Sequence, residues 1–108
     1  MEGSMKGEVV VVPFPFTDQS RAKNRPALVL IDLPGADAVL AAITTSGKGP
    51  HAITLEPKDF QKGSLDHSSY IHPVKLFTFQ KNLIRRVIGH ITETKRKEVV
   101  TKIVSLLA

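Results

Sequence analysis

Arg21, Lys23 and Arg25 are the residues of this sequence best suited to bind a phosphate. They follow the stretch "VVVVPFPFTDQS", and Pro26 comes directly after the third of them. A guanidinium carries a permanent charge on a planar fork that fits two phosphate oxygens. Because Pro26 opens an apolar stretch with a fixed backbone angle, we expect Arg25 to be held in place and the other two cations to add positive field around it. The structural alternative is that Arg25 pairs with Asp18 or caps the loop.

Hydroxyl groups form a second candidate. Thr44, Thr45 and Ser46 end an apolar stretch just before the glycine-rich turn "SGKGP". Hydroxyls and backbone N–H groups at such a point could converge on an oxyanion. Threonine is also a good strand former, so a purely structural role stays open.

Two phenylalanines, Phe14 and Phe16, stand next to this basic loop, on its N-terminal side. Aromatic rings beside cations are typical of platforms on which single-stranded nucleic acids stack their bases. The alternative is that both rings pack in the core or in a dimer contact.

Several sharper sites are excluded. The stretch "SGKGP" is not a phosphate loop, because Ala42 stands where the first glycine belongs and Gly49 where Ser or Thr should follow Lys48. The sequence has no cysteine, which removes thiolate chemistry and disulfides and fits a cytosolic protein. His67 and His72 lie five residues apart, a spacing that puts them on opposite faces of a strand, so we expect no metal and no cofactor.

Length and charge limit the class further. The 108 residues predict one small domain, and no apolar run is long enough to span a bilayer. The net charge is +5, and ten of the fifteen basic residues lie in residues 55–108 with only five of the ten acidic ones. This excess favours an anionic partner, although a solvated basic surface is the alternative.

The elements that must position these residues are short strands and one helix. Apolar, β-branched stretches separated by Pro and Gly turns predict strands at 9–12, 26–32, 38–45, 51–55, 70–79 and 84–91. The turn "SGKGP" predicts a hairpin between the third and fourth of these strands, and Pro73 a bend or bulge. Pro13 and Pro15 must stop the first strand or lie at a sheet edge.

The end of the sequence changes to a helical period. In "TETKRKEVVTKIVSLLA" the apolar residues recur on one stripe, with Thr92 as N-cap and Glu93 in the first turn. The sequence therefore predicts a mainly β fold with a C-terminal helix, arranged as a small barrel closed by that helix. We expect residues 7–108 to be a single domain, and residues 1–6 to be a flexible N-terminus or to include residues left from cloning.

Five segments occur together in a distinctive order: "KGEVVVVPFPFTDQSRAKNRPALVL" at 6–30, "AAITTS" at 41–46, "YIHPVKLFTF" at 70–79, "IGHI" at 88–91 and the amphipathic end. In this order the sequence resembles the MazF/PemK family of toxin ribonucleases from bacterial and archaeal toxin–antitoxin systems. The first segment is the most specific. The resemblance implies an SH3-like barrel (MazF/PemK/CcdB-like), a homodimer, cleavage of single-stranded RNA without a metal or cofactor, and silencing by a cognate antitoxin protein.

The resemblance also implies site residues. It places the family's arginine at Arg25 and its hydroxyl residue at Thr44, and a slip in this match would give the role to the neighbouring hydroxyls of Thr45 and Ser46. Lys75 falls in a region that contacts substrate or partner in similar proteins. We expect RNA to contact the aromatic and basic residues Phe14, Phe16, Arg21, Lys23, Lys48 and Lys75.

The implied reaction is attack of a ribose 2'-OH on its adjacent phosphorus. Arg25 would stabilise the phosphorane and Thr44 would position a phosphate oxygen. Some family members carry an acidic residue just ahead of the arginine, where this sequence reads "SRAKN", so the general base stays open among Asp18, His51 and His67. A second class also stays open: a non-catalytic toxin or regulatory module that binds a protein such as a topoisomerase. A DNA-binding regulator is disfavoured because no recognition-helix pair is present.

Overall fold

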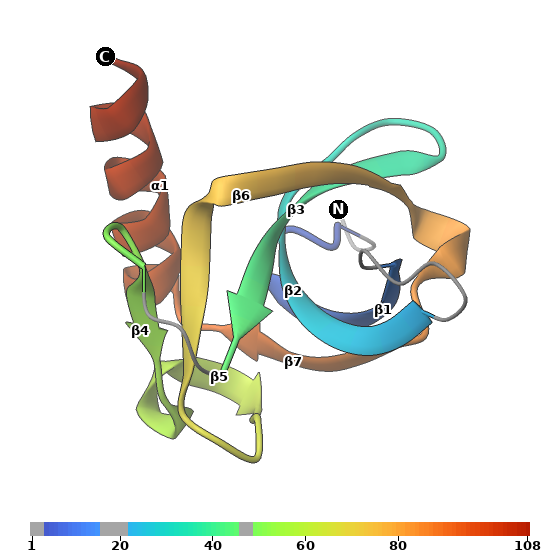
Figure 1. Cartoon of the computed structure of the whole chain (residues 1–108), viewed down its shortest axis with the longest axis horizontal. Coiled ribbons are helices and arrows are strands. Elements are labelled where there is room, and N and C mark those ends of the chain that lie inside the picture. The colour runs from blue at the N-terminus through green and yellow to red at the C-terminus, as the bar shows by residue number, and fades with distance from the viewer. Residues whose placement is uncertain (1–3, 16–21, 46–48) are drawn as a thin grey trace.

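The computed structural model describes residues 4–15, 22–45 and 49–108, which form a curled antiparallel sheet and a C-terminal helix (Figure 1). These residues supply seven strands, in the sheet order β4-β6-β3-β2-β1-β7-β5. The elements are β1 (Glu8–Pro15), β2 (Ala22–Asp32), β3 (Asp37–Thr44), β4 (Ile53–Leu55), η1 (Pro57–Asp59), β5 (Phe60–Gly63), β6 (Ser69–Gln80), η2 (Lys81–Leu83), β7 (Arg86–Ile91) and α1 (Glu93–Leu107). The mainly β class with a C-terminal helix is confirmed, with one strand more than expected.

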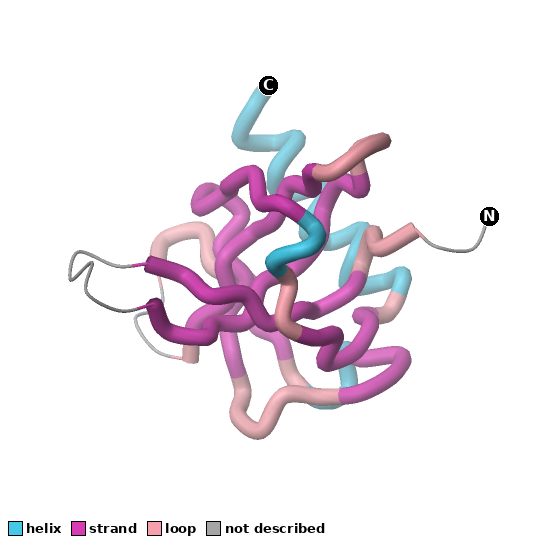
Figure 2. The backbone as a smooth tube through the Cα atoms, turned by 90° about the vertical axis from the view of Figure 1, so that its right-hand side faces the viewer, coloured by secondary structure: helices cyan, strands magenta, loops and turns pink. Residues whose placement is uncertain are grey.

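The prolines of β1 lie where the strand has a partner on one side only. β1 pairs with β7 from Glu8 to Val11, and its remainder pairs with β2 alone. Pro13 and Pro15 therefore need donate nothing to a second neighbour. The expectation that they stop the strand was wrong, and the alternative of an edge position is confirmed. The far ends of β1 and β2 project side by side from the sheet (Figure 2).

One strand pairs differently from the prediction, and one strand was not predicted. β4 pairs with β6, not with β3, so the glycine-rich turn does not form the predicted hairpin. β5 was not predicted at all, because Phe60 is the only apolar side chain of "FQKG" and gives no alternation to detect. β5 pairs with β7 in antiparallel register, with Gly63 opposite Gly89. A Cβ on either glycine would collide with the backbone of the other strand.

β6 bends sharply in its middle (Figure 1). Its register with β3 passes from Ala41↔Leu76 to Ile43↔Ile71, so four residues of β6, "HPVK", face one residue of β3. Pro73 lies in this bulge, as predicted, and lacks the N–H that a regular ladder would use. The bend turns the first half of β6 toward β4 while the second half continues along β3.

Alternating side chains divide the core between the two faces of the sheet. One set, the helix-side cluster, packs with Val99 of α1: Val9, Leu28, Ala41, Ile43, Ile53, Leu55, Ile71 and Ile91. The other, the inner cluster, comprises Val10, Val12, Ala27, Val29, Ala38 and Leu40, with Met5, Phe77, Phe79 and Ile84 against it. Met5, from the segment expected to be a flexible N-terminus, packs against this inner cluster.

α1 begins where the sequence predicted. The Thr92 hydroxyl accepts a hydrogen bond from the Lys95 N–H at 3.1 Å, and Glu93 lies in the first turn. Its apolar stripe is only partly used, because Val99 is fully buried whereas Val104 is 55% exposed. Burial of the helix therefore depends on a narrower face than the pattern suggests.

Candidate functional site

Arg25 and Thr44 lie on neighbouring strands at the same end of the sheet. β2 and β3 pair as far as Ala27↔Ala42, and the same register continued for two more residues would set Arg25 opposite Thr44. A bulge between Val29 and Ile31 creates this match. Without the bulge, the register that β2 and β3 have next to their hairpin turn would set Arg25 opposite Thr45. The bulge therefore determines whether the register brings Thr44 or Thr45 level with Arg25.

Both residues line one pocket, which encloses about 120 Å³. Its other walls are mostly apolar: Val12, Phe14, Pro26, Ala42, Ile43 and Phe77. The Arg25 side chain is half-buried and its Nε atom is fully buried, while Thr44 is also partly buried. A guanidinium held against apolar walls is weakly screened, so its attraction for an anion is greater than on an open surface.

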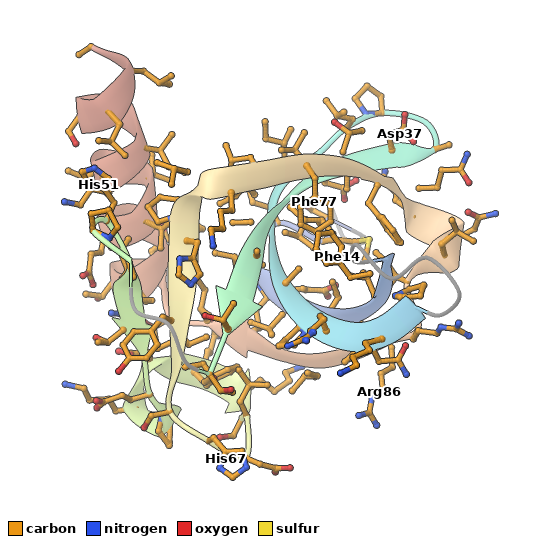
Figure 3. The ribbon with its side chains drawn as sticks, in the orientation of Figure 1. Phe14, Asp37, His51, His67, Phe77 and Arg86 are labelled. Atoms are coloured by element: carbon orange, nitrogen blue, oxygen red, sulfur yellow. The ribbon has the colours of Figure 1, made fainter. Side chains whose placement is uncertain are left out.

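Phe14 and Phe77 form the aromatic side of the pocket. They come from β1 and β6, and Figure 3 shows their side chains close together within the curl of the sheet. Since Phe77 also packs against the inner cluster, the core itself supports this wall. The pocket is therefore a continuation of the inner face of the sheet.

A histidine that sequence reasoning did not select stands behind the hydroxyl. The His72 Nε2 atom lies 2.7 Å from the Thr44 Oγ1 atom, within hydrogen-bond distance. His72 is only 3% exposed, and its burial, with a smaller contribution from the positive charge of Lys75, lowers its pKa below the ordinary 6.5. At neutral pH His72 is therefore uncharged.

The sequence carried a signal for this histidine that was read only as evidence against a metal. His72 stands between Ile71 and Pro73 in an apolar strand, which is typical of a buried side chain. Its contact with Thr44 spans 28 residues and depends on the bend of β6. No spacing rule reveals such a contact.

The other predicted residues are spread around the site. Lys23 is exposed on β2 beside Phe14 in register, Lys75 is exposed at the bend of β6, and Thr45 is exposed directly after β3. The remaining predicted residues lie outside the described part of the chain: Phe16, Asp18, Arg21, Ser46 and Lys48. Asp18, the acidic residue proposed to pair with Arg25, is one of these.

The two histidines proposed as acid or base lie elsewhere. His51 precedes β4 and His67 lies in the loop before β6, and Figure 3 shows both well apart from Phe14 and Phe77. Neither lines the pocket. Within residues 4–15, 22–45 and 49–108, no three His, Cys, Asp or Glu side chains gather as a metal site requires.

Comparison with known proteins shows what this fold and this sequence are similar to. Residues 5–107 match the family model described as PemK-like, MazF-like toxin of type II toxin-antitoxin system. A mycobacterial endoribonuclease in complex with its cognate antitoxin superposes with a TM-score of 0.76 at 17% identity, covering 97% of this chain and 95% of that one. The MazE–MazF complex (Form-II) of Deinococcus radiodurans gives 0.69 at 23% identity, covering 95% and 93%.

The toxin MazF-mt6 of Mycobacterium tuberculosis gives a TM-score of 0.71 at 16% identity, covering 93% of this chain and 95% of that one. No curated protein sequence gave a significant match. In the described ranges of the chain, no helix has the length and apolar character needed to cross a membrane. With its family model matched over nearly its whole length and the MazF-like fold present, the chain belongs to the PemK/MazF-like toxin family of type II toxin–antitoxin systems.

Proposed function

We propose that this toxin is an endoribonuclease that cleaves single-stranded RNA, without a metal, by attack of a ribose 2'-OH on the adjacent phosphorus. The observation that carries the proposal is the placement of Arg25 and Thr44 across one pocket from adjacent strands. Endoribonucleases are also named among the structural relatives.

The reaction requires little from the protein because the RNA supplies its own nucleophile. The 2'-oxygen forms a bond to phosphorus and gives up its proton, while the bond to the 5'-oxygen breaks and that oxygen takes up a proton. Arg25 offsets the negative charge that grows on the phosphorane oxygens, and the Thr44 hydroxyl donates to one of those oxygens to orient it. The products are a 2',3'-cyclic phosphate and a 5'-hydroxyl.

The surroundings of the pocket suit an RNA chain. Phe14 offers a ring on which a base can stack. Lys23, opposite Phe14 in the β1–β2 register, and Lys75, two residues before Phe77, are exposed and could bind backbone phosphates. The net charge of +5 favours the approach of a polyanion.

We also propose that the toxin forms a homodimer and is silenced by a cognate antitoxin protein. Two structural relatives are complexes with antitoxins. The toxin itself exposes large apolar side chains on two elements that contact each other, Val74 and Leu76 on β6 and Val100 and Val104 on α1. Such a surface is suited to a protein partner. Light scattering of wild type and of Val104→Asp tests the dimer, which the variant should weaken.

The test of the enzyme is cleavage of single-stranded RNA in EDTA, with end-group analysis of the products. Arg25→Ala should lower turnover by on the order of a hundredfold or more without a change in melting temperature. Arg86→Ala is the matched control, because Arg86 is exposed on β7 and its side chain points away from the molecule in Figure 3. A requirement for magnesium, or 3'-hydroxyl ends, would refute the scheme. Growth arrest without RNA cleavage would instead indicate a toxin that acts by binding a protein such as a topoisomerase.

A further inference from the structure

His72 is a buried titratable side chain that contacts the site and has no part in the reaction as written above. Its Nε2 atom is 2.7 Å from the Thr44 Oγ1 atom, and its ring is almost completely shielded from solvent. Among the described residues that line the pocket, Thr44 is the one within hydrogen-bond distance of the ring, and the ring itself is not part of the lining.

The hydroxyl group imposes a choice of direction on this hydrogen bond. A threonine hydroxyl has one proton to donate and two lone pairs that accept. If that proton were donated to His72, Thr44 would turn only lone pairs toward the negative phosphate. Thr44 can therefore donate to a phosphate oxygen only if His72 donates its Nε2–H to the Thr44 oxygen.

We infer that His72 is a positioning residue, which donates Nε2–H to Thr44 and so aims the Thr44 proton at a phosphate oxygen in the pocket. This inference rests on the proposed RNA cleavage. A chain of two hydrogen bonds in a poorly solvated site also polarises the hydroxyl and strengthens its bond to the anion.

The fold holds His72 in place for this role. Ile71, the preceding residue, is fully buried in the helix-side cluster, and Pro73 restricts the backbone of His72, the residue before it, to extended conformations. Burial keeps the imidazole uncharged at neutral pH, so the ring adds no positive charge of its own. His72 therefore acts by orienting the Thr44 hydroxyl and not through a charge of its own.

The decisive experiment is a double-mutant cycle in single-turnover cleavage of single-stranded RNA, using Thr44→Val, His72→Leu and the pair. His72→Leu should lower kcat about tenfold, the effect of losing one good hydrogen bond, with KM little changed. In the Thr44→Val background the same change should have no further effect. Additive losses would overturn the inference, because they would mean that His72 acts independently of Thr44.

Conservative rescue separates a lost direction from a damaged fold. His72→Gln places an amide N–H near the position of Nε2 and should recover most of the activity that His72→Leu loses. Asn82→Gln, at an exposed residue of η2, is the control and should leave the rate unchanged. Melting temperatures of all variants identify any loss that comes from unfolding.

The pH profile adds an independent readout. An imidazole that donates Nε2–H does so whether neutral or protonated, so His72→Gln should not remove an acidic limb from the kcat profile. If it does, His72 takes up the reaction's proton and the positioning role is wrong. If wild type and His72→Leu cleave RNA equally well, only the role of His72 is rejected. A wild type that cleaves no RNA rejects the proposed function and this inference together.

Discussion

Phe14 and Phe77 place their ring centroids 5.1 Å apart at an angle of 42°, although their strands, β1 and β6, do not pair with each other. Phe77 in turn meets Phe79 edge-on, at 6.2 Å and 88°. Such tilted and edge-on contacts are favourable arrangements of aromatic rings. The pocket wall beside Arg25 is thereby joined to the inner cluster, and its shape depends on the curl that brings β1 and β6 together.

The aromatic wall leads to a prediction about RNA affinity. Phe14→Leu retains an apolar side chain but removes the flat ring, so stacking with a base is lost. We expect roughly tenfold weaker binding, since one stacked base contributes about 1–3 kcal/mol. Fluorescence anisotropy with an RNA that carries a 2'-deoxy sugar at the cleavage position measures this without turnover. Phe60→Leu, on β5 in the opposite cluster, should bind normally; equal affinities for wild type and Phe14→Leu would exclude stacking at this ring.

Thr44 and its neighbour Thr45 offer a test of the register. Thr44→Val keeps the shape and removes the hydroxyl, so kcat should fall by on the order of a hundredfold, as when one donor to an oxyanion is removed. Thr44→Ser should retain most activity. Thr45→Val is the control, because Thr45 is exposed beyond the end of β3. A larger loss at Thr45 than at Thr44 in steady-state kinetics would mean that the other hydroxyl faces the phosphate.

How far the sequence predicts this site depends on the range of each interaction. The Thr92 cap and the strand that ends in Thr44 were predictable because their signals are local. The choice of Thr44 over the neighbouring hydroxyls as the partner of Arg25 in the site came from the family resemblance. Residue patterns alone could not supply it, since the outcome depends on a bulge that shifts the register by one residue.

Features that depend on contacts between distant segments could not be predicted from the sequence, for physical reasons. A strand at a sheet edge such as β5 is solvated and needs little apolar alternation, so it resembled a polar loop. The partner of β4 is set by the bend of β6, which no turn signal specifies. The same bend brings His72 to Thr44. The features missed are therefore those created by packing between distant segments.

Lys95 yields a prediction about stability away from the pocket. Its side chain is only 8% exposed, and its Nζ donates to the Thr54 carbonyl at 2.9 Å and lies 3.6 Å from Asp59 and 2.8 Å from Glu98. Lys95→Met keeps the stem but leaves the Thr54 carbonyl and two carboxylates without this donor, so the free energy of unfolding should fall by about 1–3 kcal/mol.

Urea denaturation of the Lys95 variant is the measurement. Lys97→Met, at an exposed position of the same helix, should change little. Cleavage of RNA by folded Lys95→Met should match wild type, because its contacts are with β4, η1 and α1. If stability is unchanged, burial of the stem alone accounts for the position.

Asp32 connects the N-terminal residues to η2 and makes stability depend on acid. Its carboxylate accepts a hydrogen bond from Lys81, and its other oxygen accepts the Met5 N–H at 2.7 Å; these bonds hold the pKa of Asp32 below the ordinary 3.8. A carboxyl whose pKa is lower in the folded than in the unfolded state contributes stability above the unfolded value. That stability is lost as the pH falls through the folded value.

We therefore expect Asp32→Asn to be less stable than wild type at pH 7 and to differ less from it at acid pH below the ordinary 3.8, as wild-type Asp32 gains its proton. Melting temperatures across this range measure the difference. Asp66→Asn, in the exposed loop before β6, provides the same loss of charge without these partners and should parallel wild type. A gap between wild type and Asp32→Asn that is equally wide at both pH values would show that the amide disturbs packing around Met5, because only the loss of an ionised partner makes the gap close with acid.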